Sequence, residues 1–280
     1  MGWVFTEDPE LFADAVLPLL LRDPVANTLA LTVLDSLQAG HRFSDAPVVL
    51  SWYCERGQVT GAVLMTPPFG LLLARLPAGS EGELVRQLRE RDIAVPDSRG
   101  TIETVHRFSS CWLAGTELTS EPVFRQRLFR LERLAPPEPM PAGSARLATL
   151  DDLDLVMDWL HAFRAEVEPG GAEPTRQMQQ RRIELRLYWL WLDSAGEPVS
   201  LAGRNVTIAG VSRVGPVYTP PEQRKHGYAA GVTAACSQHA LDTGAEQVVL
   251  FTDLANPTSN GVYRRLGYQP LDDRLVLRYR

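Results

Sequence analysis

The amino-acid sequence predicts an α/β or α+β protein built from two halves of similar length. In the C-terminal half, segments of strand character alternate with segments of helix character. Between the halves, residues 135–144 contain four prolines in ten positions. Proline has no amide donor and disfavours helix in the preceding residue, so this stretch is predicted to be an extended linker. The expected division is a domain at 1–134, the linker at 135–144 and a second domain at 145–280.

Composition supports a folded protein and limits its partners. Hydrophobic residues make up 45% of the 280 residues and charged residues 22%, which is typical of packed cores and not of disorder. The formal net charge of −6 argues against broad binding to nucleic acid or to anionic membranes, because such binding needs concentrated lysine and arginine. This balance is compatible with a cationic amine substrate, but it does not select one.

The cysteines and the N-terminal segment indicate a soluble cytoplasmic protein. Cys54, Cys111 and Cys236 are odd in number and lack the spacing of metal ligands, so we expect buried reduced thiols and no metal. Residues 1–21 lack a basic segment and contain acidic residues and a proline, unlike a signal peptide. No run of about 18 uncharged apolar residues is present, so no membrane span is predicted.

The elements of the C-terminal half follow from hydrophobic periodicity and turn residues. A helix is predicted from residue 150 to about 164, with Asp151 and Asp152 favourable near its start. Strands are predicted at 185–192, 199–206, 211–218 and 247–251, and further helices at 224–241 and 257–266. In the helix at 224–241, one buried face is expected to carry Tyr228, Val232, Ala235 and Cys236.

The N-terminal half has the same kinds of segment in a similar order. Strands are predicted at 47–53, 59–65 and 71–74. Residues 124–134 and 274–280 each end their half in alternating apolar and basic residues, as a strand does. We therefore expect the two halves to be diverged copies of one fold.

A first candidate site is the hexapeptide Arg224-Lys-His-Gly-Tyr-Ala229, which follows a predicted strand and two prolines. Exposed amides and the positive dipole at a helix start suit a diphosphate. Gly227 allows close approach of the backbone, and the neighbouring basic side chains add positive charge. An ordinary basic helix start, with a glycine kept for packing, is the alternative.

A second candidate site lies on the helix at 257–266. Asn256 is placed to cap this helix, and Pro257 suits its first turn. Asn256 and Tyr263 are seven residues apart, about two helical turns, so their side chains are expected to face the same way. A tyrosine there can donate a proton or a hydrogen bond to a bound group. The alternative is a core tyrosine that anchors the helix.

The sequence resembles the GNAT superfamily of acyl-CoA-dependent N-acyltransferases in three blocks with the family's order and spacing. They are the strand Arg213-Val-Gly-Pro-Val-Tyr-Thr219, the loop Arg224-x-x-Gly227-x-Ala229, and Asn256-x-x-Ser-x-x-Val-Tyr263-x-x-Leu-Gly-Tyr268. The resemblance covers residues 145–280, and its specific part lies in residues 211–280. It implies a mixed, mostly antiparallel sheet flanked by helices, and the similar organisation of the two halves predicts two such domains in tandem. Lys225 departs from the glycine that many members carry there, which affects the fine geometry of the loop.

The resemblance also implies roles for individual residues. Backbone groups of Val217 and Thr219 would pair with the pantetheine arm of acetyl-CoA, and the amide near Val217 would polarise the thioester carbonyl. Tyr263 would act as general acid for the leaving thiolate, and the amine would attack directly without an acyl-enzyme. The complete cofactor-binding set that it implies is Val217, Tyr218, Thr219, Arg224, Lys225, His226, Gly227, Tyr228, Ala229, Asn256 and Ser259.

The general base is open at the level of sequence. Glu166, at the end of the first helix of the C-terminal half, is the leading candidate, with Glu184 and Asp253 as alternatives. Each of these carboxylates has an ordinary solvated or capping role as its competing interpretation, and a water relay would need no carboxylate. Cys236 lies on an apolar helix face and is a poor nucleophile candidate. Trp189 and Trp191 share one strand face and are interpreted as core residues, with an acceptor pocket as the alternative.

The N-terminal half lacks the features that bind the cofactor. At the place of the phosphate loop it reads Gly79-Ser-Glu-Gly-Glu83, whose carboxylates would repel a pyrophosphate. It is therefore expected to be a degenerate copy without acyl-CoA binding.

Three functions fit the sequence. The leading one is an acetyl-CoA-dependent N-acetyltransferase acting on a small primary amine. The second is a non-catalytic module that binds or senses acyl-CoA. The third is an enzyme that modifies a protein or peptide, with the N-terminal half docking that partner.

Overall fold

The computed structural model describes residues 1–167 and 173–280, and its chain divides into two compact units. Unit 1 comprises Met1–Arg127 and Asp272–Arg280, and unit 2 comprises Leu128–Leu271. This division differs from the predicted one, in which the second domain includes the end of the sequence. The reason is a non-local exchange of strands, which no local pattern in the sequence reveals.

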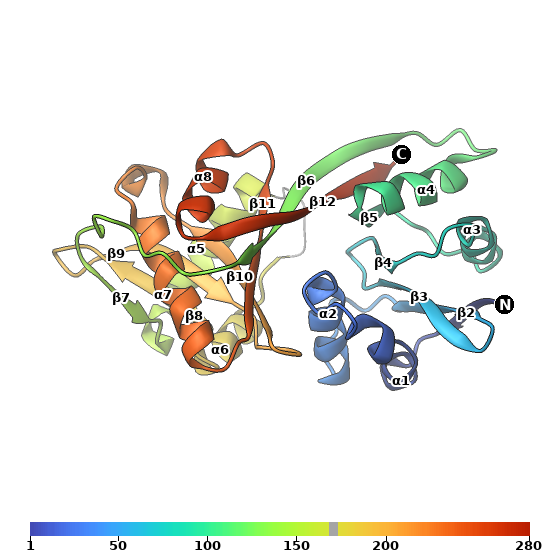
Figure 1. The fold of residues 1–280 in the computed structure, drawn as a ribbon, viewed down its shortest axis with the longest axis horizontal. Coiled ribbons are helices and arrows are strands. Elements are labelled where there is room, and N and C mark those ends of the chain that lie inside the picture. The colour runs from blue at the N-terminus through green and yellow to red at the C-terminus, as the bar shows by residue number, and fades with distance from the viewer. Residues whose placement is uncertain (168–172) are drawn as a thin grey trace. The chain divides into compact units, whose positions relative to one another are not determined.

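Unit 1 is a sheet covered by two pairs of helices (Figure 1). Its elements in chain order are β1 (Gly2–Thr6), α1 (Pro9–Leu20), α2 (Thr28–Gln38), β2 (Val49–Glu55), β3 (Gln58–Met65), β4 (Leu71–Arg75), α3 (Glu81–Glu90), β5 (Asp97–Thr101), α4 (Ile102–Leu113) and the start of β6 (Ser120–Leu131). The strands lie in the order β1-β2-β3-β4-β5, and the end of β12 (Tyr268–Tyr279) adds to β5. The predicted strands at 47–53, 59–65 and 71–74 are therefore confirmed as β2, β3 and β4.

Unit 2 repeats this order of helices and strands and adds two 3₁₀ turns. Its further elements are β7 (Ser144–Leu147), a 3₁₀ turn (Leu150–Asp152), α5 (Leu153–Val167), α6 (Arg176–Glu184), β8 (Tyr188–Leu192), β9 (Pro198–Arg204), β10 (Val211–Tyr218), a second 3₁₀ turn (Pro221–Gln223), α7 (Tyr228–Asp242), β11 (Gln247–Asp253), α8 (Pro257–Arg265) and the start of β12. The strand order is β7-β8-β9-β10-β11, with the end of β6 next to β11. Within each unit the sheet is mixed and mostly antiparallel, as predicted.

The alternation of side chains along β8 explains how helices cover both faces of the unit 2 sheet. Trp189 and Trp191 point to the face that packs against α7, whereas Tyr188 and Leu190 point to the face that packs against α5 and α6. On the first face Trp191 is buried and its indole Nε1 donates to Ala142 O at 2.9 Å. The interpretation of Trp191 as a core residue is therefore confirmed, whereas Trp189 is half-buried and packs against the margin of the same core.

The exchange of strands gives each unit a strand from the other half of the sequence. The end of β12 pairs antiparallel with β5, in the register Leu275↔Gly100 and Leu277↔Ser98. Leu275, Leu277 and Tyr279 are buried in the core of unit 1. In return, the end of β6 enters unit 2, where Phe129 and Leu131 join the core beneath α7.

The predicted linker at 135–144 is docked on unit 2. Besides the bond from Trp191 to Ala142, the amide of Ala135 donates to Leu266 O at 3.0 Å. The ring of Pro141 would lie 3.5 Å from a Cβ placed on Gly227. The segment has no helix or strand before Ser144, and it packs against the helix that begins at the candidate phosphate loop.

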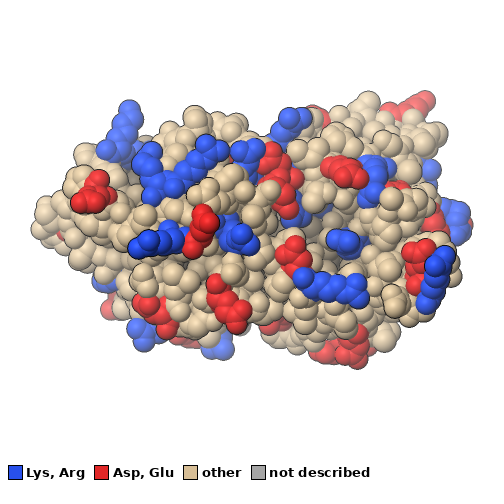
Figure 2. Space-filling view, in the orientation of Figure 1, with Lys and Arg blue, Asp and Glu red and all other residues tan. Residues whose placement is uncertain are grey.

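Two surface observations concern possible partners. Among the described residues, no helix has the length and apolar character needed to cross a membrane. On the face drawn in Figure 2, basic and acidic side chains are interspersed rather than separated by sign.

Of the three free cysteines, Cys236 is buried but Cys54 and Cys111 are half-buried, which corrects the expectation of three buried thiols. Cys54 lies beside the β2–β3 turn and Cys111 on the outer part of α4, where packing is thinner.

Candidate functional site

Two neighbouring parallel strands of unit 2 separate at the position where the sequence resemblance places the thioester. The pairing of β10 with β11 ends at Val214↔Leu250, although β10 continues to Tyr218 and β11 to Asp253. The register of β10 with β9 also shifts between Val214 and Val217, so the strand bulges there. The backbone of residues 215–218 thus has no ladder partner on β11, and it can accept a ligand that pairs as an added strand.

Sequence reasoning missed this separation, because it treated residues 211–218 as one regular strand. A signal was present in Gly215-Pro216. Proline cannot donate to a strand ladder, and within sheets it is largely confined to edges and bulges. The bounds of the strand itself, Val211–Tyr218, are as predicted.

A loop with unused amides follows β10. Helix α7 begins at Tyr228, four residues later than predicted, because Lys225 and Gly227 have positive φ angles of 68° and 83° and cannot belong to a right-handed helix. The amides of residues 225–229 have no acceptor among the described residues. Consecutive free amides in this kind of backbone, at the positive end of a 15-residue helix, form an anion-binding concavity.

The basic side chains of this loop have different surroundings. Lys225 and His226 are exposed, and the His226 ring stacks on Tyr228 with centroids 5.5 Å apart. Arg224 is engaged within the protein: its Nε donates to Thr219 O at 2.9 Å, and its Nη2 lies 2.8 Å from both carboxylate oxygens of Glu166. The positive charge available to a bound anion therefore comes first from Lys225 and from the helix terminus.

Helix α8 begins as predicted, with Asn256 as its N-cap. The Asn256 Oδ1 accepts the Ser259 amide at 3.0 Å, and its Nδ2 has no acceptor among the described residues. Asn260 fixes the preceding turn by donating to Asp253 O at 2.9 Å and to Asn256 O at 2.7 Å. Because Asn256 is the cap rather than a helical residue, its side chain is turned to the helix start and is not simply in line with Tyr263.

Tyr263 is a half-buried residue of α8 with a protonated hydroxyl. Burial raises its pKa to about 12, and no described residue forms a hydrogen bond with its hydroxyl. Its ring meets the Tyr268 ring edge-on, with centroids 6.1 Å apart. Tyr263, Tyr228 and Val217, one residue from each of the three sequence blocks, all pack against the core cluster beneath α7.

The candidate general bases are all engaged in other contacts. Glu166 is paired with Arg224 at the end of α5. Glu184, the last residue of α6, accepts from Gln180 Nε2 at 3.2 Å. The Asp253 Oδ1 accepts the Ala255 amide at 2.8 Å and so caps the turn before α8.

Cys236 is buried in α7 and is unsuited to nucleophilic chemistry. Burial raises the pKa of its thiol to about 12, and its Sγ lies 3.7 Å from Gly203 O. The four consecutive residues 231–234 of α7 are buried, so this part of the helix is buried on every side and not only along the predicted face. Ala235, which was predicted to lie on the buried face, is half-buried.

Unit 1 has the same arrangement of β4, loop and α3, but its site is filled by its own side chains. Ser80 is the N-cap of α3, and Glu81 and Glu83 occupy its first turn. Arg107 reaches from α4 to this turn, where its Nη2 donates to Leu76 O at 2.6 Å and its Nε lies 3.1 Å from Glu81 Oε1. A carboxylate and a guanidinium thus occupy the place where unit 2 has free amides.

Loss of the Glu81 charge is expected to loosen this part of unit 1. The Glu81 side chain is 8% exposed and forms an ion pair with Arg107. Glu81→Gln removes the charged partner of a largely buried guanidinium, so it should lower the free energy of local opening by about 2 kcal/mol. Glu103→Gln is the matched control, since Glu103 lies in the first turn of α4, 3.8 Å from the same Arg107, but is 82% exposed. Its cost should stay below about 0.5 kcal/mol. Hydrogen exchange of the α3 and α4 amides measures both, and equal losses would contradict the structural role of Glu81.

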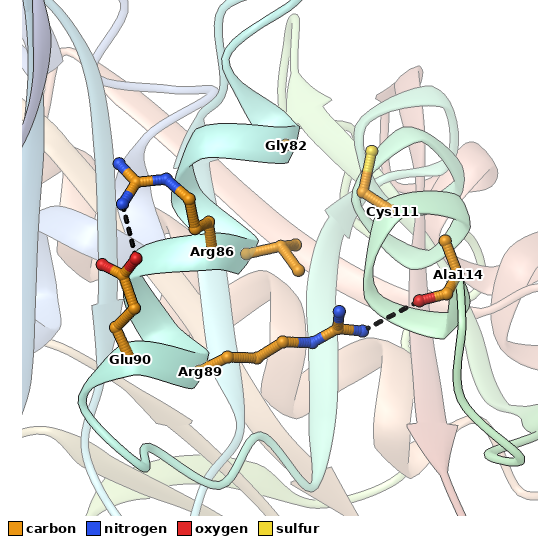
Figure 3. Close-up of a pocket in the computed structure, with 7 residues that line it drawn as sticks. Gly82, Arg86, Arg89, Glu90, Cys111 and Ala114 are labelled. Carbon is orange, nitrogen blue, oxygen red and sulfur yellow. Dashed lines mark hydrogen bonds and ion pairs between the residues drawn. The ribbon is translucent and has the colours of Figure 1, made fainter.

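A pocket in unit 1 lies between α3 and α4 (Figure 3). It is lined by Gly82, Val85, Arg86, Arg89, Glu90, Cys111 and Ala114. Its charged groups are satisfied within the protein, because Arg86 pairs with Glu90 at 2.6 Å and Arg89 donates to Ala114 O at 3.2 Å. None of the residues of the predicted site lines it.

Comparison with known proteins identifies the fold. Residues 194–277 match the model of a family described as FR47-like protein, which is of GNAT type. A comparison with curated proteins finds no significant match. The predicted resemblance to the GNAT superfamily is confirmed by the family model together with the solved structures below.

Several solved structures share the fold over the whole chain at low sequence identity. A GNAT-family acetyltransferase from Colwellia psychrerythraea is 11% identical, with a TM-score of 0.61 and coverage of 100% of this chain and 99% of that chain. A tandem GNAT protein from the clavulanic acid biosynthesis pathway is 14% identical, with a TM-score of 0.60 and coverage of 100% and 98%. A GCN5-related N-acetyltransferase from Kribbella flavida is 22% identical, with a TM-score of 0.56 and coverage of 90% and 95%. The protein therefore has the GNAT fold in two tandem copies.

Proposed function

We propose that unit 2 transfers an acetyl group from acetyl-CoA to a primary amine. One observation supports this above the others: β10 parts from β11 after Val214, and the next helix begins with a row of unused amides. Acetyl-CoA has a diphosphate, which the free amides can bind, and an extended arm that ends in a thioester, which can lie along the unpaired part of β10. A small amine is the preferred acceptor, and a protein amine is the alternative.

The cofactor is placed by backbone groups in this proposal. The diphosphate accepts hydrogen bonds from the amides of residues 225–229, and the pantetheine arm lies along β10 beside Val217 and Thr219. Asn256 and Ser259 border the arm from the α8 side. The amide of Val217 donates to the thioester oxygen as negative charge develops on it, a contribution of about 3–4 kcal/mol for one such donor.

Direct attack of the amine on the carbonyl carbon breaks the C–S bond and leaves the CoA thiolate. Tyr263 is the donor available to the sulfur. A phenol with a pKa of about 12 is a weaker acid than a thiol, whose pKa is about 8.5, so complete proton transfer to the thiolate is unfavourable. The role that fits Tyr263 is therefore a hydrogen bond to the sulfur as the bond breaks, worth about 1.5–3 kcal/mol to a charged acceptor.

A second function, binding of acyl-CoA without turnover, is favoured by the state of the carboxylates. Glu166, Glu184 and Asp253 each have a partner in the free protein, and none of them is left as an evident base. If the protein is an enzyme, the proton of the attacking amine passes to water instead of to a carboxylate. A relay of this kind needs no free carboxylate, so the paired carboxylates do not exclude the enzyme. A measurement of turnover decides between the two functions.

Binding of acetyl-CoA, measured by calorimetry, together with thiol release in the presence of a panel of primary amines, tests the proposal. Micromolar binding with turnover supports the enzyme, and binding without turnover on any amine or labelled protein supports the sensing module. No binding of acetyl-CoA or of longer acyl-CoAs by the wild-type protein would reject both.

Tyr263→Phe is expected to slow turnover by about 10- to 100-fold with little change in acetyl-CoA affinity, because the lost hydrogen bond forms mainly as the C–S bond breaks. Tyr268→Phe is a matched control. Its hydroxyl bonds to Ser237 Oγ at 2.7 Å inside the core, so its loss should cost about 1 kcal/mol of stability and leave turnover unchanged. Equal turnover by the wild type and Tyr263→Phe would remove Tyr263 from the reaction.

A further inference from the structure

The guanidinium of Arg224 joins two parts of unit 2 that are distant in sequence. Its Nη2 lies 2.8 Å from Oε1 and 2.8 Å from Oε2 of Glu166, and its Nε donates to Thr219 O at 2.9 Å. All three contacts are charge-assisted, and charge-assisted bonds are the stronger class. One side chain therefore connects the end of α5 to the backbone at the end of β10.

The segment held in this way leads directly to the free amides. Residues 219–224 contain a 3₁₀ turn, which is closed by Gln223 N to Pro220 O at 2.9 Å and by Arg224 N to Pro221 O at 3.3 Å. These local bonds shape the turn but do not fix it to the rest of the unit. The first residue of the segment is attached to β9, because Thr219 Oγ1 lies 2.8 Å from Ser200 Oγ. The contacts of Arg224 with Glu166 attach its other end, immediately before the positive-φ residue Lys225.

The pair of Arg224 and Glu166 lies close to the buried residue Tyr218. Tyr218 is buried, its ring lies 6.2 Å from that of Trp159 on α5, and burial followed by the nearby Glu166 charge raises its pKa. Both partners of the pair are roughly half exposed, so its Coulomb energy alone is small. Its effect depends on geometry, because the same guanidinium also holds a backbone carbonyl.

We propose that Glu166 is a positioning residue for the cofactor loop and not the general base. It acts through Arg224: it orients the guanidinium, which holds Thr219, and the loop then presents the amides of residues 225–229 to the diphosphate. Both Glu166 oxygens lie 2.8 Å from the same guanidinium nitrogen, so the carboxylate is oriented toward Arg224 in the free protein. This inference rests on the proposed binding of acetyl-CoA by unit 2.

A double-mutant cycle tests the proposal. Glu166→Gln and Arg224→Gln are each expected to weaken acetyl-CoA binding about 5- to 10-fold, and the double variant should bind no more weakly than the worse single variant. In steady-state kinetics, Glu166→Gln should raise KM while kcat and the acid limb of the pH profile stay unchanged. Glu197→Gln, in the exposed turn between β8 and β9, removes the same charge elsewhere and should leave binding unchanged.

Two outcomes would overturn the proposal. If Glu166→Gln slowed turnover by about 100-fold or more, with unchanged affinity and a lost acid limb, Glu166 would be identified as the base. If Glu166→Gln left both the affinity for acetyl-CoA and the turnover unchanged, the ion pair between Glu166 and Arg224 would be a surface contact without a role in cofactor binding.

Hydrogen exchange in the free protein separates this proposal from the function on which it rests. Glu166→Gln and Arg224→Gln should each speed exchange of the amides of residues 223 and 224 several-fold, whether or not acetyl-CoA binds, because these two amides are hydrogen-bonded in the 3₁₀ turn. If the wild-type protein bound no acetyl-CoA but showed this acceleration, the proposed function would fail and the positioning of the loop would stand. Unchanged exchange in both variants would contradict the positioning role directly.

Discussion

Replacement of Gly227 with aspartate is expected to weaken acetyl-CoA binding by at least about 100-fold. Gly227 is the N-cap of α7, and a Cβ there would meet Pro141 only at an ordinary 3.5 Å, so the site has room for a side chain. A carboxylate about 5 Å from the diphosphate would cost roughly 3 kcal/mol at an effective dielectric constant near 20. The same carboxylate favours the helix itself, because negative charge at a helix N-terminus is stabilising. Any side chain at this φ of 83° is strained, so the effect of the charge is the loss of binding beyond that of an uncharged side chain of the same shape.

Gly227→Asn is the isosteric control. Asparagine and aspartate are among the residues that best tolerate a positive φ, so both variants face the same backbone requirement at 83°. The asparagine variant should bind acetyl-CoA within about 10-fold of the wild type, and calorimetry on all three proteins gives the comparison. Equal loss in both variants would mean that shape rather than charge excludes the ligand. Normal binding by the aspartate variant would place the diphosphate elsewhere.

Deletion of residues 272–280 is expected to prevent unit 1 from folding, although unit 1 contains the first 127 residues of the chain. The deletion removes Leu275, Leu277 and Tyr279, which are 1%, 6% and 8% exposed in its core. At about 1.5–3 kcal/mol for each large buried side chain, the loss is roughly 5–9 kcal/mol, similar to the whole stability of a domain. The bond between Tyr279 OH and Ser98 Oγ, at 2.6 Å, is lost as well.

Graded variants separate this effect from a general effect of truncation. Leu275→Ala should destabilise unit 1 by about 2–5 kcal/mol, whereas Val276→Ala, on the half-buried side of the same strand, should cost less than about 1.5 kcal/mol. Hydrogen exchange of the β2, β3 and β5 amides measures the protection of unit 1 in the full chain. Normal protection in the deletion variant would mean that β5 does not need β12 as its neighbour.

Local signals in the sequence were sufficient for the order of these elements and for the position of the loop before α7. The strand at residues 211–218, the strand from Gln247 and the helix from Pro257 lie where apolar runs and capping residues predict them. Helix α6 was not predicted, because only Gln179 and Ile183 of its nine residues are buried and no apolar stripe marks it. Its stability comes from tertiary contacts rather than from its own periodicity.

Features that depend on pairing between distant residues could not be predicted from local patterns in the sequence. Glu166 was selected as a base because of its place on a helix, but its contact with Arg224 spans 58 positions. The choice of β12 as the neighbour of β5 likewise joins residues more than 170 positions apart. Alternating apolar and basic residues at 274–280 correctly indicate a strand, yet such a pattern carries no information on which sheet receives it.

The exchange of strands also sets the timing of folding during synthesis. An N-terminal domain ordinarily folds while the rest of its chain is still being made, at about 5–20 residues per second. Unit 1 must instead wait for β12, because residues 128–271 are translated between Arg127 and Asp272. At those rates the delay is about 7–30 s. For that time the apolar face of α4 and the edge of β5 lack the strand that covers them, and they are exposed to chaperones and to aggregation.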